Sequence, residues 1–453
     1  MFVLINVVVY CQTESSFEEH KTNYKVIKLD SKYFLDEKRI IKISLPENYD
    51  KTKKYPVIYT LDGYSLFKMV ASYTHILGKQ TTEEDGYDYG TNVIPPAIVV
   101  GIFHNDRNLE TEPNFDGLDY LEKPNDLKNF LVSEVVPYIN STCSISGYNS
   151  IIGHSNTAYF TTNLLFQKDI TFQSIIALSL TEGSTAFYKK LTETLNSKVD
   201  GSFFLGYGLK DNEFNWIAKK TEANVSNKNV LVKKYNSNHS DLPASSLLDA
   251  IKYLFNDYRN FNDFNVLSTN TDFKIDEYLN SYEVKIKNKY GISTQILEDD
   301  YASLLVETIN NRNIDAFNML VEYYEKKNDF EYPPIMLFHY RKDLGDSLEA
   351  KNIAYQILES TDENVYKFLV NKQINSFTDF FVENLNSPKE AIQFLAEGKK
   401  KYPEHRLEFS YFIAKTSIEN NYQLTKGKSN LRFCVKNYKK NWYFTELDLE
   451  NLK

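Results

Sequence analysis

The chain has 453 residues, which is long enough for two or three domains and at least one sizeable hydrophobic core. Hydrophobic residues make up 42% and charged residues 25%, which are ordinary values for a globular protein. The net charge of −9 and the lack of any long basic block exclude general nucleic-acid binding, and the 3 cysteines are too far apart to indicate a disulfide framework or a metal site.

The first residues form an apolar run that is too short to span a bilayer. Residues 1–11 read MFVLINVVVYC, and a polar segment follows from Gln12. This pattern resembles the end of a truncated secretory signal peptide, and a buried first strand is the alternative. No other segment is apolar enough to predict a membrane span. We therefore expect an exported protein of bacterial type, either secreted or periplasmic.

Strand patterns alternate with helix patterns between residues 39 and 258. Apolar runs bounded by turn residues predict strands at residues 39–45, 56–61, 97–102, 150–152, 172–178, 202–207 and 229–233. Apolar residues at helical spacing predict helices at residues 64–77, 126–137, 156–166 and 247–258. This alternation predicts a mostly parallel central sheet with helices on both faces, in an α/β domain over residues 12–262.

The character of the sequence changes after about residue 262. A stretch rich in Asn and Asp at residues 260–272 has the composition of a linker, and helical patterns follow it. Similar helical segments repeat at 34 and then 41 residues, at Ala316, Ala350 and Ala391. Paired helices near a 34-residue period resemble tetratricopeptide-type repeats, with an irregular helical bundle as the alternative. The sequence therefore predicts an all-α, helical-repeat domain over residues 263–453.

One stretch, SIIGHSNTA at residues 150–158, combines an apolar run, a tight turn and the start of a helix. A strand, a sharp turn with a central serine and a helix form the nucleophile elbow of an α/β-hydrolase. Ser155 is therefore the predicted nucleophile, and small residues such as Gly153 let the strand and the helix approach closely. Thr157 occupies the place of the second glycine in the G-x-S-x-G pattern. An ordinary serine in a strand–helix turn is the alternative.

An acyl-transfer site also needs a base and an acid that orients the base. His239 is the predicted base, because it lies between the last predicted strand and the closing helix. Asp211 follows the strand at residues 202–207 and is the predicted acid, with Glu213 as its close alternative.

The oxyanion of the tetrahedral intermediate needs two hydrogen-bond donors. The backbone N–H of Asn156, directly after the nucleophile, is one predicted donor. The other comes from the loop after the strand at residues 56–61, where either Gly63 or Tyr64 provides it.

These motifs together resemble the putative esterase family, the esterase D and enterochelin-esterase-like branch of the α/β-hydrolases. The resemblance covers about residues 25–260 and rests on the following stretches: LPENY at 45–49, YPVIYTLDG at 55–63, EVVPYI at 134–139 and IGHS at 152–155. The stretch GIFHNDR at residues 101–107, followed by Glu110, looks like a loop motif that borders the site in this family. Asn105 and Arg107 match that motif, so they either contact substrate or fix the loop by hydrogen bonds.

The resemblance implies an α/β-hydrolase fold and a serine hydrolase of carboxylic esters or thioesters, without a metal or organic cofactor. The triad implied is Ser155, His239 and Asp211. Small-molecule esters, siderophore esters and acylated carbohydrates are all substrates that the family permits, and the helical domain offers a surface for a protein partner.

This sequence departs from the family pattern G-H-S-x-G-G at the elbow, where Asn156, Thr157 and Ala158 follow Ser155. A β-branched Thr157 is expected to crowd the oxyanion side of the site. A rival hypothesis is therefore an inert hydrolase fold that binds a partner protein through its helical domain.

Overall fold

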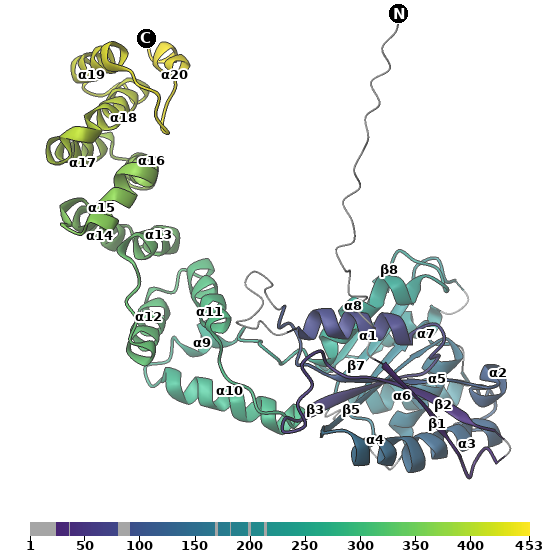
Figure 1. Cartoon of the computed structure of the whole chain (residues 1–453). Coiled ribbons are helices and arrows are strands. Elements are labelled where there is room, and N and C mark those ends of the chain that lie inside the picture. Colours follow the sequence, from purple (N-terminus) through teal and green to yellow (C-terminus); the bar gives the residue numbers. More distant parts are fainter. Residues whose placement is uncertain are drawn as a thin grey trace, which may run out of the picture. The chain divides into compact units, whose positions relative to one another are not determined.

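The computed structural model describes residues 24–35, 37–79, 91–167, 171–181, 183–197, 201–212 and 215–453. The chain divides into two compact units (Figure 1). One unit extends to Asn260 and includes Ser281–Gln295, and the other comprises Phe261–Asn280 and Ile296–Lys453. The predicted signal peptide at residues 1–11 lies outside the described residues.

An eight-stranded sheet forms the centre of the first unit, in the order β1-β2-β4-β3-β5-β6-β7-β8. Its strands are β1 (Tyr24–Leu29), β2 (Arg39–Ser44), β3 (Tyr55–Thr60), β4 (Ile98–Ile102), β5 (Ile145–His154), β6 (Ser174–Leu178), β7 (Phe203–Gly208) and β8 (Val230–Tyr235). The pairs β1–β2 and β2–β4 are antiparallel, and all the other pairs are parallel. The predicted mostly parallel sheet is confirmed, and β1 is an additional strand that the sequence patterns did not predict.

Helices cover both faces of this sheet. They are α1 (Phe67–Gly78), α2 (Arg107–Glu110), α3 (Glu122–Phe130), α4 (Val136–Thr142), α5 (Asn156–Asn163), α6 (Thr185–Asn196), α7 (Trp216–Asn224) and α8 (Leu242–Leu254). A π-helical segment, Leu131–Val135, joins α3 to α4. The predicted helix at residues 126–137 therefore continues past Pro137, which follows the π-helical segment directly as the second residue of α4.

Alternate side chains of the central strands point to opposite faces, which explains their continuously apolar sequences. Val57 and Tyr59 of β3 belong to the core that includes Phe130 of α3 and Phe160 of α5. Helices α1 and α8 pack against each other (Figure 1). Helix α1 also packs on β4, and α8 packs on β6, β7 and β8. The sheet is thus buried on both faces, as the composition of its strands predicts.

The chain reverses its direction of winding between β3 and β5. After β3 it proceeds to β4 on one side, and it then crosses to β5 on the other side of β3. In open α/β sheets, ligands bind beyond the carboxyl ends of the strands at such a switch point. The loop that begins at Asp62 and the turn at Ser155 follow these two strands, so both lie at this edge of the sheet.

The second unit contains helices joined by short connections, and its described residues form no strand. The remaining helices of the chain are α9 (Phe264–Leu267), α10 (Ile275–Tyr290), α11 (Glu298–Asn310), α12 (Ile314–Asn328), α13 (Pro334–Leu344), α14 (Ser347–Glu359), α15 (Glu363–Phe368), α16 (Ile374–Asp379), α17 (Pro388–Lys401), α18 (Arg406–Glu419), α19 (Leu424–Asn437) and α20 (Glu446–Asn451). Consecutive helices such as α13 and α14, or α17 and α18, pack together. The predicted α-helical region is confirmed, and the tetratricopeptide-type repeat stays a prediction.

Candidate active site

Ser155 lies in the sharp turn between β5 and α5. Its backbone has φ 63° and ψ −124°, a conformation that residues other than glycine rarely adopt. Its N–H donates to the carbonyl of Leu178 on β6 at 2.9 Å. Its own carbonyl accepts the N–H groups of Ala158 and Tyr159, at 2.9 and 3.1 Å. Neighbouring backbone therefore holds Ser155 in the strained turn on both sides, as an elbow requires.

Gly153 is the residue that lets β5 and α5 meet so closely. A Cβ atom at Gly153 would lie 2.2 Å from the carbonyl oxygen of Thr157 and 2.8 Å from the nitrogen of Ala158. Both contacts are with backbone, which cannot move without opening the turn. Glycine at this position is therefore a geometric condition for the turn that carries Ser155.

The structure brings together Asp211 and His239, the predicted acid and base. Asp211 follows β7, His239 follows β8, and the Nδ1 atom of His239 lies 2.9 Å from Oδ2 of Asp211. The carboxylate is 5% exposed and also accepts a hydrogen bond from the hydroxyl of Ser179, whereas the imidazole is 31% exposed. A buried carboxylate thus holds a half-exposed imidazole in a fixed orientation. The alternative acid, Glu213, lies outside the described residues.

His154, next to Ser155, contacts the loop that carries His239. Its Nε2–H donates to the backbone carbonyl of His239 at 2.8 Å, and the two rings lie 4.7 Å apart. Burial, and the proximity of the imidazole of His239, lower the pKa of His154 to about 4. His154 is therefore neutral near pH 7, and it ties the elbow to the loop of the predicted base.

The two alternative oxyanion donors after β3 differ in their hydrogen bonding. The N–H of Gly63 already donates to the carbonyl of Ile102 at 2.8 Å. No atom among the described residues accepts the N–H of Tyr64, and the same holds for the N–H of Asn156 in the first turn of α5. Of the predicted donors, Asn156 and Tyr64 are therefore the two whose N–H groups have no acceptor among the described residues.

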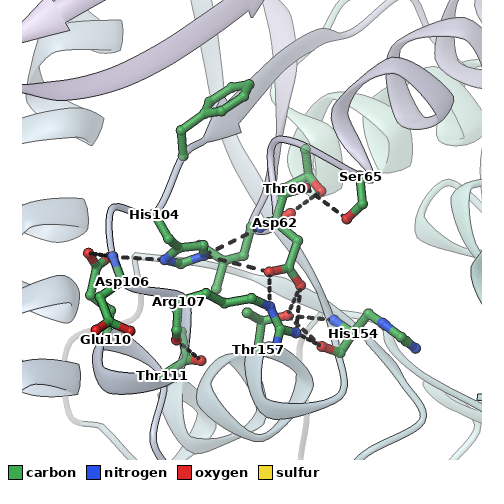
Figure 2. Close-up of polar contacts among 12 residues, drawn as sticks. Thr60, Asp62, Ser65, His104, Asp106, Arg107, Glu110, Thr111, His154 and Thr157 are labelled. Atoms are coloured by element: carbon green, nitrogen blue, oxygen red, sulfur yellow. Dashed lines mark hydrogen bonds and ion pairs between the residues drawn. The ribbon is translucent and has the colours of Figure 1, made fainter. Parts of the chain in front are cut away.

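Thr157 does not crowd the site as the sequence led us to expect, because its side chain is buried and fully hydrogen-bonded (Figure 2). Its hydroxyl accepts the N–H of His154 at 2.7 Å and lies 2.7 Å from Oδ2 of Asp62. The guanidinium of Arg107 binds the same carboxylate through Nε, at 2.5 Å, and Nη2, at 3.1 Å. Arg107 also donates to the carbonyl of His154 at 2.9 Å. In this structure Arg107 thus fixes the loop and the elbow.

A buried carboxylate, Glu110, supports this loop from behind. It forms two hydrogen bonds with the fully buried guanidinium of Arg39, at 2.7 and 2.6 Å, and accepts the Nδ1–H of His104 at 3.0 Å. Burial opposes the ionisation of Glu110, but the hydrogen bonds from Arg39 and His104 outweigh it and lower the pKa to about 2. Glu110 also accepts the backbone N–H of Asn105, whose side chain donates to Glu37 at 2.6 Å. Asn105 therefore makes loop-fixing hydrogen bonds.

Sequence reasoning missed the polar network behind the elbow, which consists of the buried Arg39, Asp62 and His104 and the partly buried His154. Asp62 carried one signal, because an Asp-Gly pair directly after a buried strand favours a left-handed turn, and Asp62 has φ 54°. No cluster of described residues has the composition of a metal site, and no described helix could cross a bilayer.

Residues 31–241 match a protein-family model described as Putative esterase. The matched residues lie in the first unit, which we call the esterase domain. This esterase domain contains the elbow, the Asp211–His239 pair and the Asp62 loop. The protein is therefore a hydrolase, and its reaction in general terms is the hydrolysis of esters. No curated protein matches the chain.

Several solved structures resemble this protein in fold. An uncharacterised protein from Capnocytophaga ochracea is 17% identical, with a TM-score of 0.52, and the match covers 76% of this chain and 98% of that chain. An IroE-like serine hydrolase from Shewanella oneidensis is 19% identical over 66% of this chain and 97% of its own, with a TM-score of 0.47. The siderophore hydrolase EstA from Aspergillus nidulans is 15% identical over 52% and 95%, with a TM-score of 0.41. At 17% identity the likeness to the Capnocytophaga ochracea protein concerns the fold alone.

Proposed function

We propose that the protein is a serine esterase that cleaves carboxylic esters or thioesters through an acyl-enzyme. The observation that carries this proposal is the hydrogen bond between His239 and the buried Asp211, beside the strained turn that holds Ser155. A buried carboxylate, an imidazole and a serine on a tight turn are the parts that activate a hydroxyl nucleophile. The match to the esterase family model supports the ester as substrate class.

Acylation follows from the proposed roles. Oγ of Ser155 attacks the carbonyl carbon of the ester, and Nε2 of His239 takes its proton. Asp211 accepts the Nδ1–H of His239, which leaves Nε2 as the basic nitrogen and stabilises the imidazolium. The N–H groups of Asn156 and Tyr64 bind the negative oxygen of the tetrahedral intermediate. The imidazolium then protonates the leaving alcohol or thiol as its bond to the carbonyl carbon breaks.

Deacylation repeats these steps with water as the nucleophile. His239 removes a proton from the water, and the resulting hydroxide attacks the carbonyl carbon of the acyl group on Ser155. The oxyanion again lies between the two N–H donors. When the intermediate collapses, His239 returns the proton to Oγ, and the carboxylic acid leaves. The reaction draws only on protein side chains, backbone amides and water.

The rival hypothesis of an inert hydrolase fold rested on the steric effect of Thr157 and on the repeat-like helical region. In this structure the side chain of Thr157 is buried and its hydroxyl lies 2.7 Å from Oδ2 of Asp62, which supports a site that Thr157 does not crowd. The N–H of Asn156 has no acceptor among the described residues. This geometry favours a working enzyme over a partner-binding relative without activity.

The proposal is tested with p-nitrophenyl acetate and a fluorophosphonate probe. We expect wild type to hydrolyse the ester and to be labelled, and Ser155→Ala to lose both properties. Ser245→Ala is the matched control, because Ser245 is an exposed serine on α8 that bonds to the carbonyl of Asp241. Wild-type rates in Ser155→Ala would overturn the proposal. A series of acyl chain lengths and acetylated sugars then defines the substrate.

A further inference from the structure

We infer that Thr157 is a positioning residue, which holds the two oxyanion donors at a fixed separation by binding the carboxylate of Asp62. The inference rests on the proposed function and adds a role that the triad does not include. Thr157 follows Asn156, the first donor, and Asp62 lies two residues before Tyr64, the second. One hydrogen bond therefore joins two segments that are 95 residues apart in the sequence.

The direction of the hydrogen bond follows from what surrounds the hydroxyl. Oγ1 of Thr157 lies 2.7 Å from Oδ2 of Asp62 and 2.8 Å from the carbonyl oxygen of His154. A hydroxyl has a single proton to donate. Arg107 donates to both acceptors, and of the two the carboxylate forms the stronger, charge-assisted bond. The proton of Thr157 therefore goes to Asp62, and a lone pair accepts the N–H of His154.

Asp62 in turn determines the path of the loop that carries Tyr64. Its backbone is left-handed, with φ 54°, which costs free energy for a residue other than glycine and persists only where neighbours hold it. Its side chain is held by Thr157 and Arg107. Its carbonyl accepts the N–H groups of Ser65 and Leu66, both at 2.9 Å. Tyr64 lies within this turn, so the backbone conformation of Asp62 determines the direction of the N–H of Tyr64.

The expected effect is on kcat and not on KM. The oxyanion forms only in the transition state and the intermediate, so a shift between the two donors weakens the transition state and leaves the bound ester nearly unchanged. Arg107 still joins Asp62 to the carbonyl of His154, so the loop stays attached when the hydroxyl of Thr157 is removed. Removal of the hydroxyl eliminates only the hydrogen bond from Thr157, which together with Arg107 fixes the orientation of the Asp62 carboxylate.

The experiment compares three substitutions on one helix in the full-length protein. Thr157→Val removes the hydroxyl and keeps the shape, and Thr157→Ser keeps the hydroxyl. Thr161→Val is the matched control, because Thr161 is equally buried but donates to the carbonyl of Ala158 in its own helix. For each variant, kcat and KM for p-nitrophenyl acetate are measured, with the Ki of phenylboronic acid, which forms a tetrahedral adduct with an active-site serine.

We expect Thr157→Val to lower kcat about 10- to 100-fold and to raise the boronate Ki in parallel, with KM within threefold of wild type. Thr157→Ser and Thr161→Val should keep wild-type values. If Thr157→Val does not fold, Thr157→Ala is measured against the same criteria. An unchanged kcat in the folded variant, with Ser155→Ala inactive, overturns this inference alone. Equal rates in Ser155→Ala and wild type overturn both this inference and the proposed function.

Discussion

Nδ1 of His239 lies 2.9 Å from Oδ2 of Asp211, although 28 residues separate them and each stands in a different loop. The two loops follow β7 and β8, which are parallel neighbours, so their carboxyl ends meet at one edge of the sheet. The hydroxyl of Ser179, after β6, also binds this carboxylate. Three adjacent strands thus set the orientation of one imidazole.

Asp211→Asn is expected to lower kcat about 10³- to 10⁴-fold, because an amide cannot hold the required tautomer of His239 or stabilise its imidazolium. The rate of p-nitrophenyl acetate hydrolysis measures the effect. Asp249→Asn is the control, since the carboxylate of Asp249 binds Lys233 and Tyr235 on β8, and it should leave kcat within twofold of wild type. If Asp211→Asn lowers kcat less than tenfold, Asp211 is not the acid of the triad, and Glu213 is the remaining candidate.

Gly153→Ala is expected to destabilise the esterase domain by at least about 2 kcal/mol, because the new methyl would overlap the backbone of Thr157. Urea unfolding followed by Trp216 fluorescence in a Trp442→Phe background measures it, since these are the 2 tryptophans of the chain. Gly117→Ala is the control, because a Cβ there would meet only the movable side chain of Asn114, at 3.2 Å. Equal stability of both variants would contradict the constraint at the elbow.

The central strands could be predicted from the sequence, whereas β1 could not. The strands around β3 and β5 are buried on both faces and therefore read as unbroken apolar runs between turn residues. Tyr24–Leu29 forms the edge strand β1, which pairs only with β2 and is half-exposed or exposed at every position. An edge strand without a buried face has no hydrophobic pattern to reveal it.

The elements that would carry the triad were predictable for a similar reason. Ser155, Asp211 and His239 each follow a strand, and the order of the strands brings their ends together. The bond between Thr157 and Asp62 was not predictable, because it depends on the register of β3 against β5 and on a left-handed Asp62. From the sequence we considered only the volume of the Thr157 side chain and therefore expected it to crowd the oxyanion side. In the structure the hydrogen bonds of its hydroxyl determine where the side chain lies.

The stability of the esterase domain is expected to fall between about pH 6.5 and pH 4 because of His154. Its pKa is lowered from 6.5 to about 4 by burial and by His239, so in this window the unfolded chain binds a proton that the folded chain does not. The free energy of unfolding is therefore not reduced by His154 above pH 6.5. As the pH falls to 4, protonation of His154 in the unfolded chain lowers it by up to about 3 kcal/mol.

Urea unfolding at several pH values, followed by Trp216 fluorescence, compares wild type with His154→Gln. Glutamine keeps an N–H donor for the carbonyl of His239 but does not titrate. The free energy of unfolding of His154→Gln should therefore decline less steeply over this window. Parallel curves for the two proteins would show that the burial of His154 does not contribute to the acid sensitivity.

Arg39 and Glu110 form an ion pair that is closed to solvent, with side-chain exposures of 0% and 4%. A second carboxylate, Glu37, lies 3.6 Å from the same guanidinium but is 48% exposed. The two glutamates therefore differ in burial while they share a partner. The pKa of Glu110 is lowered from 4.5 to about 2, so its contribution to stability is present above pH 4.5 and is lost as the pH falls toward 2.

Glu110→Gln is expected to destabilise the esterase domain by about 3 to 5 kcal/mol at pH 7, because it removes the buried counter-ion of Arg39 and leaves only the more exposed Glu37, 3.6 Å away. Glu37→Gln, at the exposed carboxylate, should cost less than about 1 kcal/mol. Unfolding by urea between pH 7 and pH 3 distinguishes the two. The difference between wild type and Glu110→Gln should shrink below pH 4.5, as the wild-type carboxylate begins to lose its advantage. If both variants lose the same small amount, the buried pair does not support the loop that holds Asp62, and Thr157 and Arg107 alone must fix it.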